Sequence, residues 1–122
     1  MHYLVDRTMT AAENLPYSIS GRDLVMEADG LCVQILTLAS GEKIPWHYHA
    51  TVSDIFIGLE GTTVVETRAP RARHELGPGE HYVVPPGTAH EASDKDGKGC
   101  RFTIVQGIGE HDFNLVGKGA AL

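Results

Sequence analysis

Two histidines separated by a single residue, His47 and His49, are the part of the sequence best suited to chemistry. They lie in a run that is typical of a β-strand, where side chains two positions apart leave from the same face. The Cα atoms of such a pair are roughly 6.5 Å apart, and a metal ion lies about 2.1 Å from a coordinating imidazole nitrogen. The two rings can therefore converge on one cation, and the pair predicts part of a metal site.

Further ligands are predicted from two places later in the chain. His90 follows a turn in which Pro85 fixes the backbone and Gly87 permits a positive φ angle, so this histidine should be aimed consistently. Asp54 is the candidate fourth ligand. It lies five residues after the histidine pair, an odd spacing that an unbroken strand would send to the opposite face. We therefore expect a turn or bulge within residues 50–53.

The elements that must position these residues are predicted to be short strands joined by tight turns. After residue 22, apolar runs of a few residues alternate with turn signals such as Asp29-Gly30 and Gly77-Pro78-Gly79. The expected strands are 24–28, 31–38, the histidine strand, 55–59, 62–67, 72–76, 82–84, the run from His90 and 101–108. About nine such strands and no long helix predict a single all-β domain over residues 1–122, either a barrel or a sandwich.

Composition narrows the classes of function. The chain has 122 residues, enough for one domain with its own core, and 42% of them are hydrophobic. A net charge of -6 argues against a nucleic-acid partner, and neither a Lys/Arg cluster nor a long apolar window suggests a membrane. Cys32 and Cys100 lie in apolar runs and are interpreted as buried free thiols. The N-terminus lacks the apolar stretch of a secretion signal, so we expect a cytoplasmic protein.

Two spaced motifs resemble the conserved motifs of the cupin superfamily. The first reads G-x5-H-x-H-x4-D-x6-G from Gly41 to Gly61, and the second reads G-x5-P-x-G-x2-H-x3-D from Gly79 to Asp94. The sequence departs from the family pattern at Asp54, where cupins usually carry glutamate, and at Asp94, where they usually carry asparagine.

The resemblance implies a cupin-type double-stranded β-helix, which is a jelly-roll barrel of roughly six to eight antiparallel strands. Such a barrel holds one divalent metal near its mouth, and its ligands would correspond to His47, His49, His90 and Asp54. Aspartate is shorter than glutamate by roughly 1.3 Å. Asp54 therefore ligates directly only if its strand lies closer, and otherwise acts through water or beside the ligands. Iron, manganese, nickel, zinc and copper all remain candidates for the metal.

A centre of this kind is expected to act on a small oxygenated metabolite. Histidines, a carboxylate and open coordination positions can bind an oxygen-rich substrate as a chelate, activate dioxygen or polarise a carbonyl group. We expect dioxygenase chemistry first and a metal-dependent lyase or isomerase second, with Asp54 or a metal-bound water carrying any proton that moves. The alternative is a metal- or sugar-binding cupin module without turnover.

The residues that follow Asp54 are apolar at successive positions of the expected strand. Phe56 has the same parity as Asp54 and should face the cavity, which leaves Ile55 and Ile57 on the other face. A strand that is apolar on both faces needs cover on both. We expect that cover from the N-terminal segment, residues 1–20, or from a second subunit in a homodimer.

The last long run, 101–108, leaves two assignments open. Either alternating set of its residues could face inward, so Arg101 and Gln106 are both candidate substrate contacts. The C-terminal tail, residues 109–122, is Gly-rich and is expected to have little to pack. The histidines outside the two motifs are interpreted as structural or solvated for His2, His74 and His111, with His81 kept as a candidate.

Overall fold

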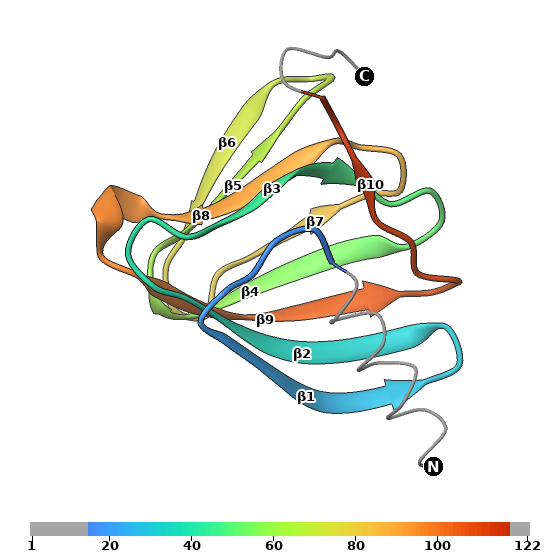
Figure 1. The fold of residues 1–122 in the computed structure, drawn as a ribbon, viewed down its shortest axis with the longest axis horizontal. Coiled ribbons are helices and arrows are strands. Elements are labelled where there is room, and N and C mark those ends of the chain that lie inside the picture. The colour runs from blue at the N-terminus through green and yellow to red at the C-terminus, as the bar shows by residue number, and fades with distance from the viewer. Residues whose placement is uncertain (1–14, 118–122) are drawn as a thin grey trace.

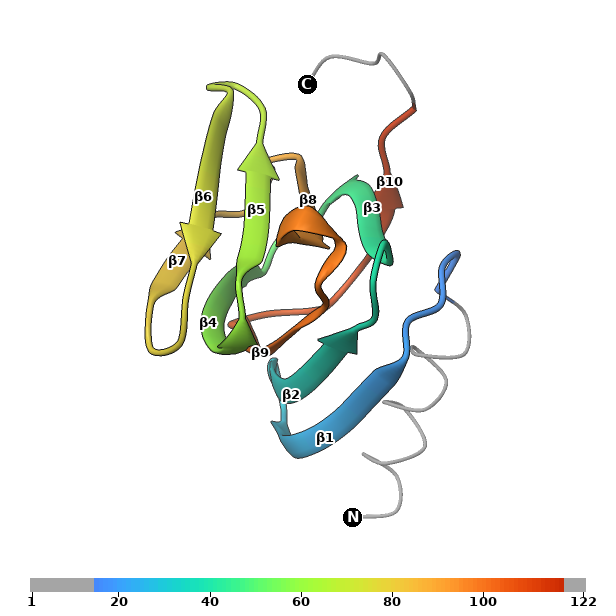
Figure 2. The same ribbon diagram turned by 90° about the vertical axis from the view of Figure 1, so that its left-hand side faces the viewer.

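The computed structural model describes residues 15–117, which form two antiparallel five-stranded sheets packed face to face (Figures 1 and 2). In chain order the strands are β1 (Gly21–Ala28), β2 (Leu31–Leu38), β3 (Lys43–Tyr48), β4 (Ser53–Gly61), β5 (Thr63–Thr67), β6 (Ala72–Leu76), β7 (His81–Val84), β8 (His90–Asp94), β9 (Cys100–Gly107) and β10 (Asn114–Leu115), with a short 3-10 helix η1 (Lys95–Gly97). One sheet has the order β1-β2-β9-β4-β7 and the other β10-β3-β8-β5-β6.

The predicted all-β jelly roll is confirmed. Eight strands, β2 to β9, make two four-stranded sheets, and the order within each sheet shows that β1 and β10 each add one strand at an edge. These two additions raise the number of strands above the six to eight that the resemblance implies. Figure 2 shows both of them on the same side of the sandwich.

The core lies between the sheets and is built by alternation along each strand. In β4 the inward residues include Phe56, which is 1% exposed, while Ile55 and Ile57 are only half-buried on the outer face, as the parity predicted. In β9 the inward set contains Phe102 and Ile104. Arg101 therefore faces outward and reaches Glu60 at the surface, with 3.5 Å between Nη1 and Oε2, and does not line the cavity.

Asp94 explains one of the two departures from the family pattern. Its Oδ1 accepts a hydrogen bond from the backbone N–H of Gly41 at 3.3 Å, and its Oδ2 accepts one from Gly99 at 2.7 Å. A carboxylate can accept at both oxygens, whereas an asparagine side chain offers one acceptor and one donor group. The first and second motifs are thus tied together by a side chain that suits two N–H partners.

The N-terminal strand begins earlier than predicted. β1 starts at Gly21 and pairs in register with β2, Gly21 opposite Thr37 and Arg22 opposite Leu36. Residues 22 and 23 are polar, so a hydrophobicity pattern does not predict a strand there. Pairing with β2 nevertheless stabilises the strand at these residues. A register shift between Leu24 and Met26 then turns the rest of the strand relative to its start.

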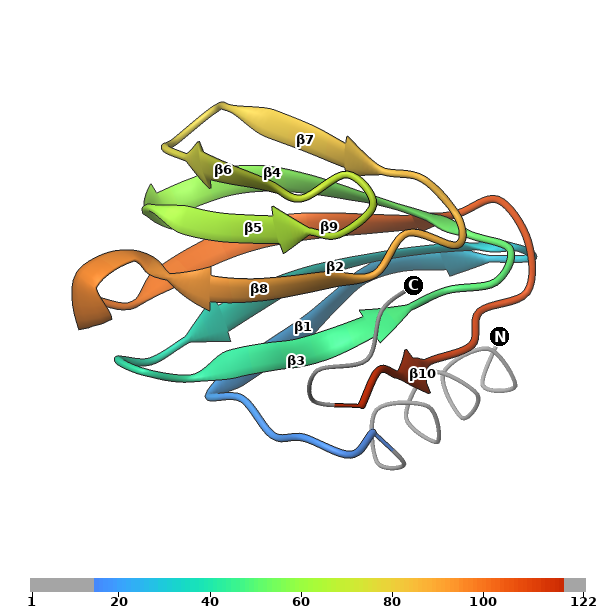
Figure 3. The same cartoon turned by 90° about the horizontal axis from the view of Figure 1, so that it is seen from above.

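The expectation that the chain beyond residue 108 has little to pack is wrong for its described part. β10 pairs with the end of β3, with Asn114 opposite Tyr48 (Figure 3). Phe113, just before it, packs against the core cluster. Phe113 is a single large apolar residue among polar and glycine neighbours, and its packing holds this segment against the core. One such residue gives almost no periodic signal in the sequence.

The predicted cover of the outer face of β4 by the N-terminal segment stays a prediction. Residues 1–14 lie outside the described part of the chain, and Tyr17 and Ile19 pack against the core cluster between the sheets. The homodimer stays a prediction from the half-buried outer face of β4. Within residues 15–117 there is no helix long and apolar enough to cross a membrane, and the cytoplasmic location likewise stays a prediction.

Gly58 offers a test of how tightly β4 is held in place. A Cβ atom at this buried glycine would lie 2.3 Å from the carbonyl oxygen of Gly77, a backbone atom that has little freedom to move. We expect Gly58→Ala to lower the free energy of unfolding by about 1–3 kcal/mol, measured by urea denaturation. Gly77→Ala is the matched control, because its Cβ would meet only the Glu80 side chain at 3.4 Å. Equal stabilities of the two variants would contradict this packing.

Candidate metal centre

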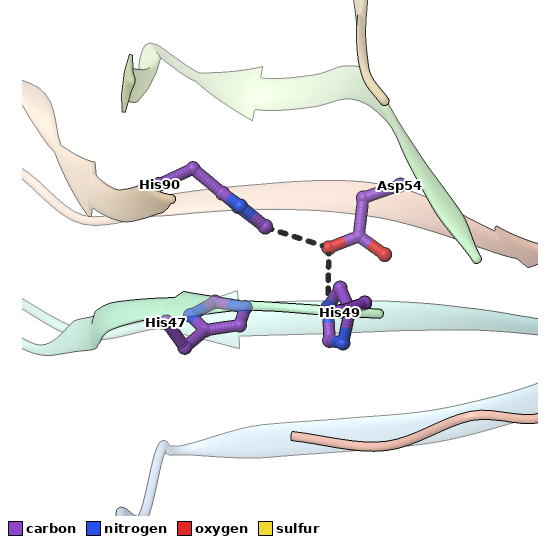
Figure 4. A group of neighbouring side chains, drawn as sticks. All are labelled: His47, His49, Asp54 and His90. Carbon is purple, nitrogen blue, oxygen red and sulfur yellow. Dashed lines mark hydrogen bonds and ion pairs between the residues drawn. The ribbon is translucent and has the colours of Figure 1, made fainter. Parts of the chain in front are cut away.

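Four buried side chains converge between the sheets: His47, His49, Asp54 and His90 (Figure 4). None of them is more than 3% exposed. One ligand atom from each residue lies within 4.8 Å of the others, so the cluster could hold a metal ion. The four residues that the sequence singled out are therefore brought together.

Strand pairing positions the histidines. β3 and β8 are antiparallel neighbours, and His47 lies directly opposite His90, with 4.2 Å between the ring centroids. The turn before β8 is fastened to the histidine pair, because the Gly87 N–H donates to the carbonyl oxygen of His49 at 2.7 Å. Gly87 has a φ angle of 79°, which is accessible to glycine at little cost. The turn thus aims His90 at its two partners, as expected.

Asp54 reaches the same centre because the strand is interrupted where the odd spacing required it. β3 ends at Tyr48 and β4 begins at Ser53, with a bend between them. Once on β4, Asp54 lies opposite Gln106 of β9. The Gln106 amide donates to Asp54 Oδ1 at 3.0 Å, so the inward face of β9 orients the carboxylate.

The backbone fixes which nitrogen of each imidazole faces the centre. All three Nδ1 atoms are within hydrogen-bond distance of a backbone carbonyl oxygen, which can only accept, so each Nδ1 carries a proton. The acceptors are Pro45 for His47 at 2.6 Å, Asp112 for His49 at 2.5 Å and Thr88 for His90 at 2.9 Å. Three Nε2 atoms are thereby left to serve as ligands, the arrangement that is usual around metal-bound histidines.

The chemistry of the donor set fits a divalent ion. Asp54 Oδ2 lies 2.9 Å from His49 Nε2 and 2.8 Å from His90 Nε2. With both Nδ1 atoms protonated, neutral rings would present Nε2 lone pairs to the carboxylate oxygen, which is repulsive. A divalent cation among the same atoms would attract both nitrogens and the oxygen while leaving the imidazoles neutral. Such mixed nitrogen and oxygen ligands suit first-row transition metals.

Burial and mutual contacts set the charges of the metal-free cluster. Burial, reinforced by the charge of His90, lowers the pKa of His47 to about 3, so this ring is neutral at pH 7. Burial also opposes charge on His49, but the hydrogen bond to Asp54, the Asp54 charge and the contacts to Asp112 together outweigh burial and raise the pKa of His49. For Asp54, the cost of burial is outweighed by hydrogen bonds from His49 and His90, which hold the pKa of its carboxyl well below the usual range.

The C-terminal segment contributes residues that the sequence did not reveal. Besides its carbonyl contact to His49, Asp112 accepts the N–H of Ala50 at 2.9 Å through its carboxylate. Phe113 stacks on His47, with ring centroids 4.2 Å apart and planes inclined by 17°. His111 lies 5.0 Å from His49, ring to ring, in the cavity wall. His111 is exposed, so its interpretation as structural or solvated stays a prediction, although its ring lies beside a candidate ligand.

The other histidines outside the motifs lie away from the centre or cannot be placed. His74 stacks on Tyr82 at 3.6 Å, which agrees with a structural role. His81 is exposed on β7 and does not line the cavity. His2 lies outside the described residues.

A cavity of about 460 Å³ opens beside the cluster and gives a small molecule access to it. Its inner wall contains His47, His49, Asp54 and Phe56, together with Gln106. Of the two candidate substrate contacts on β9, Gln106 is the one that faces inward. It donates a hydrogen bond to Asp54 and lines the cavity. A volume of this size is ordinary for a small-molecule site.

The low pKa of His47 predicts acid sensitivity of the metal-free protein. The unfolded chain takes up the proton near pH 6.5 but the folded one only near pH 3, so stability falls as the pH decreases across this interval, by about 1 kcal/mol per pH unit. The raised pKa of His49 acts above pH 6.5 instead, where its stabilising proton is lost. Urea denaturation after chelator treatment, at pH 6.5 and 4.5, should show a weaker pH dependence for His47→Gln. Identical dependence in both proteins would contradict the assignment.

Known proteins resemble this chain in sequence pattern and fold. The family model of the cupin domain matches residues 34–106, which contain both motifs. No curated protein sequence matches the chain significantly.

Solved structures share the architecture at low identity. A cupin-2 domain containing protein from Shewanella frigidimarina NCIMB 400 is 23% identical, with a TM-score of 0.61 over 81% of this chain and 91% of its own. KdgF from Halomonas sp. is 21% identical, with a TM-score of 0.62 over 73% of this chain and 80% of its own. Oxalate oxidase in complex with the substrate analogue glycolate is 17% identical, with a TM-score of 0.64 over 71% of this chain and 46% of its own. These likenesses show the fold, and since the family model spans more than half of the sequence, the chain belongs to the cupin domain family.

Proposed function

We propose that this protein is a metal-dependent cupin enzyme that acts on a small oxygenated metabolite, with dioxygenase chemistry as its reaction. One observation carries the proposal: three histidines and one carboxylate bring a ligand atom each within 4.8 Å of one another, and His47, His49 and Asp54 also line an open cavity. A purely structural cluster would gain nothing from access to a cavity of about 460 Å³. The three histidines and Asp54 are the residues that would hold the ion.

The ion would supply a Lewis acid and, if it is iron, a redox partner for dioxygen. The chain itself supplies fixed geometry. The Nδ1 hydrogen bonds hold the imidazole planes, so His47, His49 and His90 need not reorganise when the ion binds. Phe113, stacked on His47, and Phe56 shield the ligands from bulk water on the apolar side.

Asp54 has no proton to donate at neutral pH and can take part in proton transfer only as the acceptor. Its pKa lies below the usual range, so its carboxylate is ionised at neutral pH. Oδ2 faces two ligand histidines, and Oδ1 is held by the Gln106 amide. Gln106 therefore positions Asp54 and lies close enough to the cavity to contact a substrate as well.

Loss of a ligand should remove the metal. We expect His47→Ala and His90→Ala to retain less than about a tenth of the wild-type metal content after dialysis, because each removes a fixed nitrogen donor. Asp54→Asn should lose less, since an amide oxygen remains at the same place. Elemental analysis of the purified proteins measures this, with His81→Ala as the control because His81 is exposed and outside the cluster. Equal metal content in wild type and His47→Ala would count heavily against the site.

Oxygen consumption tests the reaction. Iron-loaded wild-type protein should take up dioxygen when supplied with a keto acid, catechol or uronate that it accepts, and His47→Ala should not. An oxygen electrode gives the uptake, and chromatography of the reaction mixture gives the product. Turnover of a substrate under strict anaerobiosis would instead indicate a lyase or isomerase. No turnover across the panel, with metal bound, would favour a binding module without activity.

A further inference from the structure

A second polar group lines the same cavity, away from the metal ligands. It consists of Arg22, Tyr17 and Gln34. Arg22 Nη2 donates to the Tyr17 hydroxyl oxygen at 2.7 Å, and its Nη1 donates to Gln34 Oε1 at 3.2 Å. Gln34 is only 7% exposed, so it forms a fixed support for the guanidinium. None of these three residues belongs to either of the two sequence motifs.

The fold turns this group toward the metal centre. Arg22 on β1 lies opposite Leu36 on β2, which is a core residue, so the arginine starts from the inward face of its sheet. Tyr17 packs on Phe113 with ring centroids 5.4 Å apart, and Phe113 in turn stacks on His47 at 4.2 Å. One aromatic ring therefore separates the polar group from a candidate metal ligand.

The group has hydrogen-bond donors to spare. A guanidinium has five N–H bonds, and the contacts to Tyr17 and Gln34 use only part of that set. The Tyr17 oxygen accepts from Arg22, which leaves its own hydrogen free to donate. Burial raises the pKa of Tyr17 more than the Arg22 charge lowers it, so that hydrogen is retained at neutral pH. Within residues 15–117 no carboxylate lies within ion-pairing distance of Arg22.

The charge around the cavity selects among anions. Arg22 brings a single positive charge, and its planar fork matches a carboxylate. Glu27 and Glu110 also line the cavity, and Glu27 Oε1 is buried without a hydrogen-bond partner among the described residues. These carboxylates disfavour a second negative charge on a ligand, whether from a dicarboxylate or from a phosphate dianion. The balance of charges favours a monocarboxylate.

We propose that Arg22 and Tyr17 bind the carboxylate of a small monocarboxylate ligand whose other end faces the histidine–aspartate cluster, and that Gln34 positions Arg22. This inference rests on the proposed function, because it names the substrate class of that same cavity. It assigns binding of the acid group to the edge strand β1 and the chemistry to the strands that carry the histidines.

Paired ligands that differ only in charge test the proposal. Lactate, glycerate and gluconate are each titrated against their primary amides into ¹⁵N-labelled protein, both metal-free and loaded with zinc, and affinities are read from amide shifts. At least one acid should bind wild type roughly tenfold or more tighter than its amide in both states. Arg22→Gln should abolish this preference, Arg22→Lys should recover part of it, and Tyr17→Phe should weaken it by about threefold or more. Arg101→Gln is the matched control, because it removes one positive charge outside the cavity.

The outcomes separate this inference from the proposed function. It is overturned if acids and amides bind wild type equally or not at all, if folded Arg22→Gln keeps the preference, or if glycerol phosphate binds more tightly than glycerate. Dispersed amide spectra establish that each variant is folded. If Arg22→Gln does not fold, the acid preferences of Arg22→Lys and Tyr17→Phe decide the test instead. If wild type binds zinc but shows no preference for acids, this inference alone is overturned. If wild type prefers acids but binds no metal, the proposed function alone is overturned.

Discussion

The structure depends on one buried carboxylate oxygen shared by two imidazoles. Asp54 Oδ2 lies within 3 Å of two Nε2 atoms, one from His49, which directly follows β3, and one from His90, which begins β8 in the same, opposite sheet. An uncompensated charge at a site this deeply buried would cost several kcal/mol. The two sheets must therefore approach here with their positive and negative groups matched. A divalent cation meets the same requirement, which is why a buried cluster of this composition suits a metal.

Most of the surrounding structure keeps this contact in place. The Nδ1 atoms are tied to backbone carbonyl oxygens, Gln106 orients Asp54 from the neighbouring strand, and the Gly87 turn is hydrogen-bonded to the histidine pair. Each of these restraints comes from main chain or from a residue directly opposite in a sheet. Rigid restraints of this kind reduce the reorganisation that binding would otherwise require. These restraints leave the side of the cluster that faces the cavity open, and a ligand can bind there.

Much of the centre could be predicted because it follows from the period of a strand. His47 and His49 share a face by that rule, and the same rule required the break before Asp54. The inward face of β9 could not be chosen, since both alternating sets contain apolar residues and one polar candidate. Phe113 was missed for a different reason, because its contact with His47 joins segments far apart in the sequence and leaves no trace in a local pattern. Arg22 was missed because its polar side chain hid the beginning of β1 from a pattern based on hydrophobic residues.

The hydrogen bond from His49 to the carbonyl of Asp112 links the candidate metal site to the C-terminal segment. Whatever cation binds His49 favours the imidazole orientation in which that hydrogen bond is made. By thermodynamic reciprocity, docking of the terminal segment and retention of the ion strengthen each other to the same degree. Removing the chain from Asp112 onward would thus weaken the binding of an ion at His49, some sixty residues earlier. In turn, release of such an ion would favour undocking of this segment from the edge of β3.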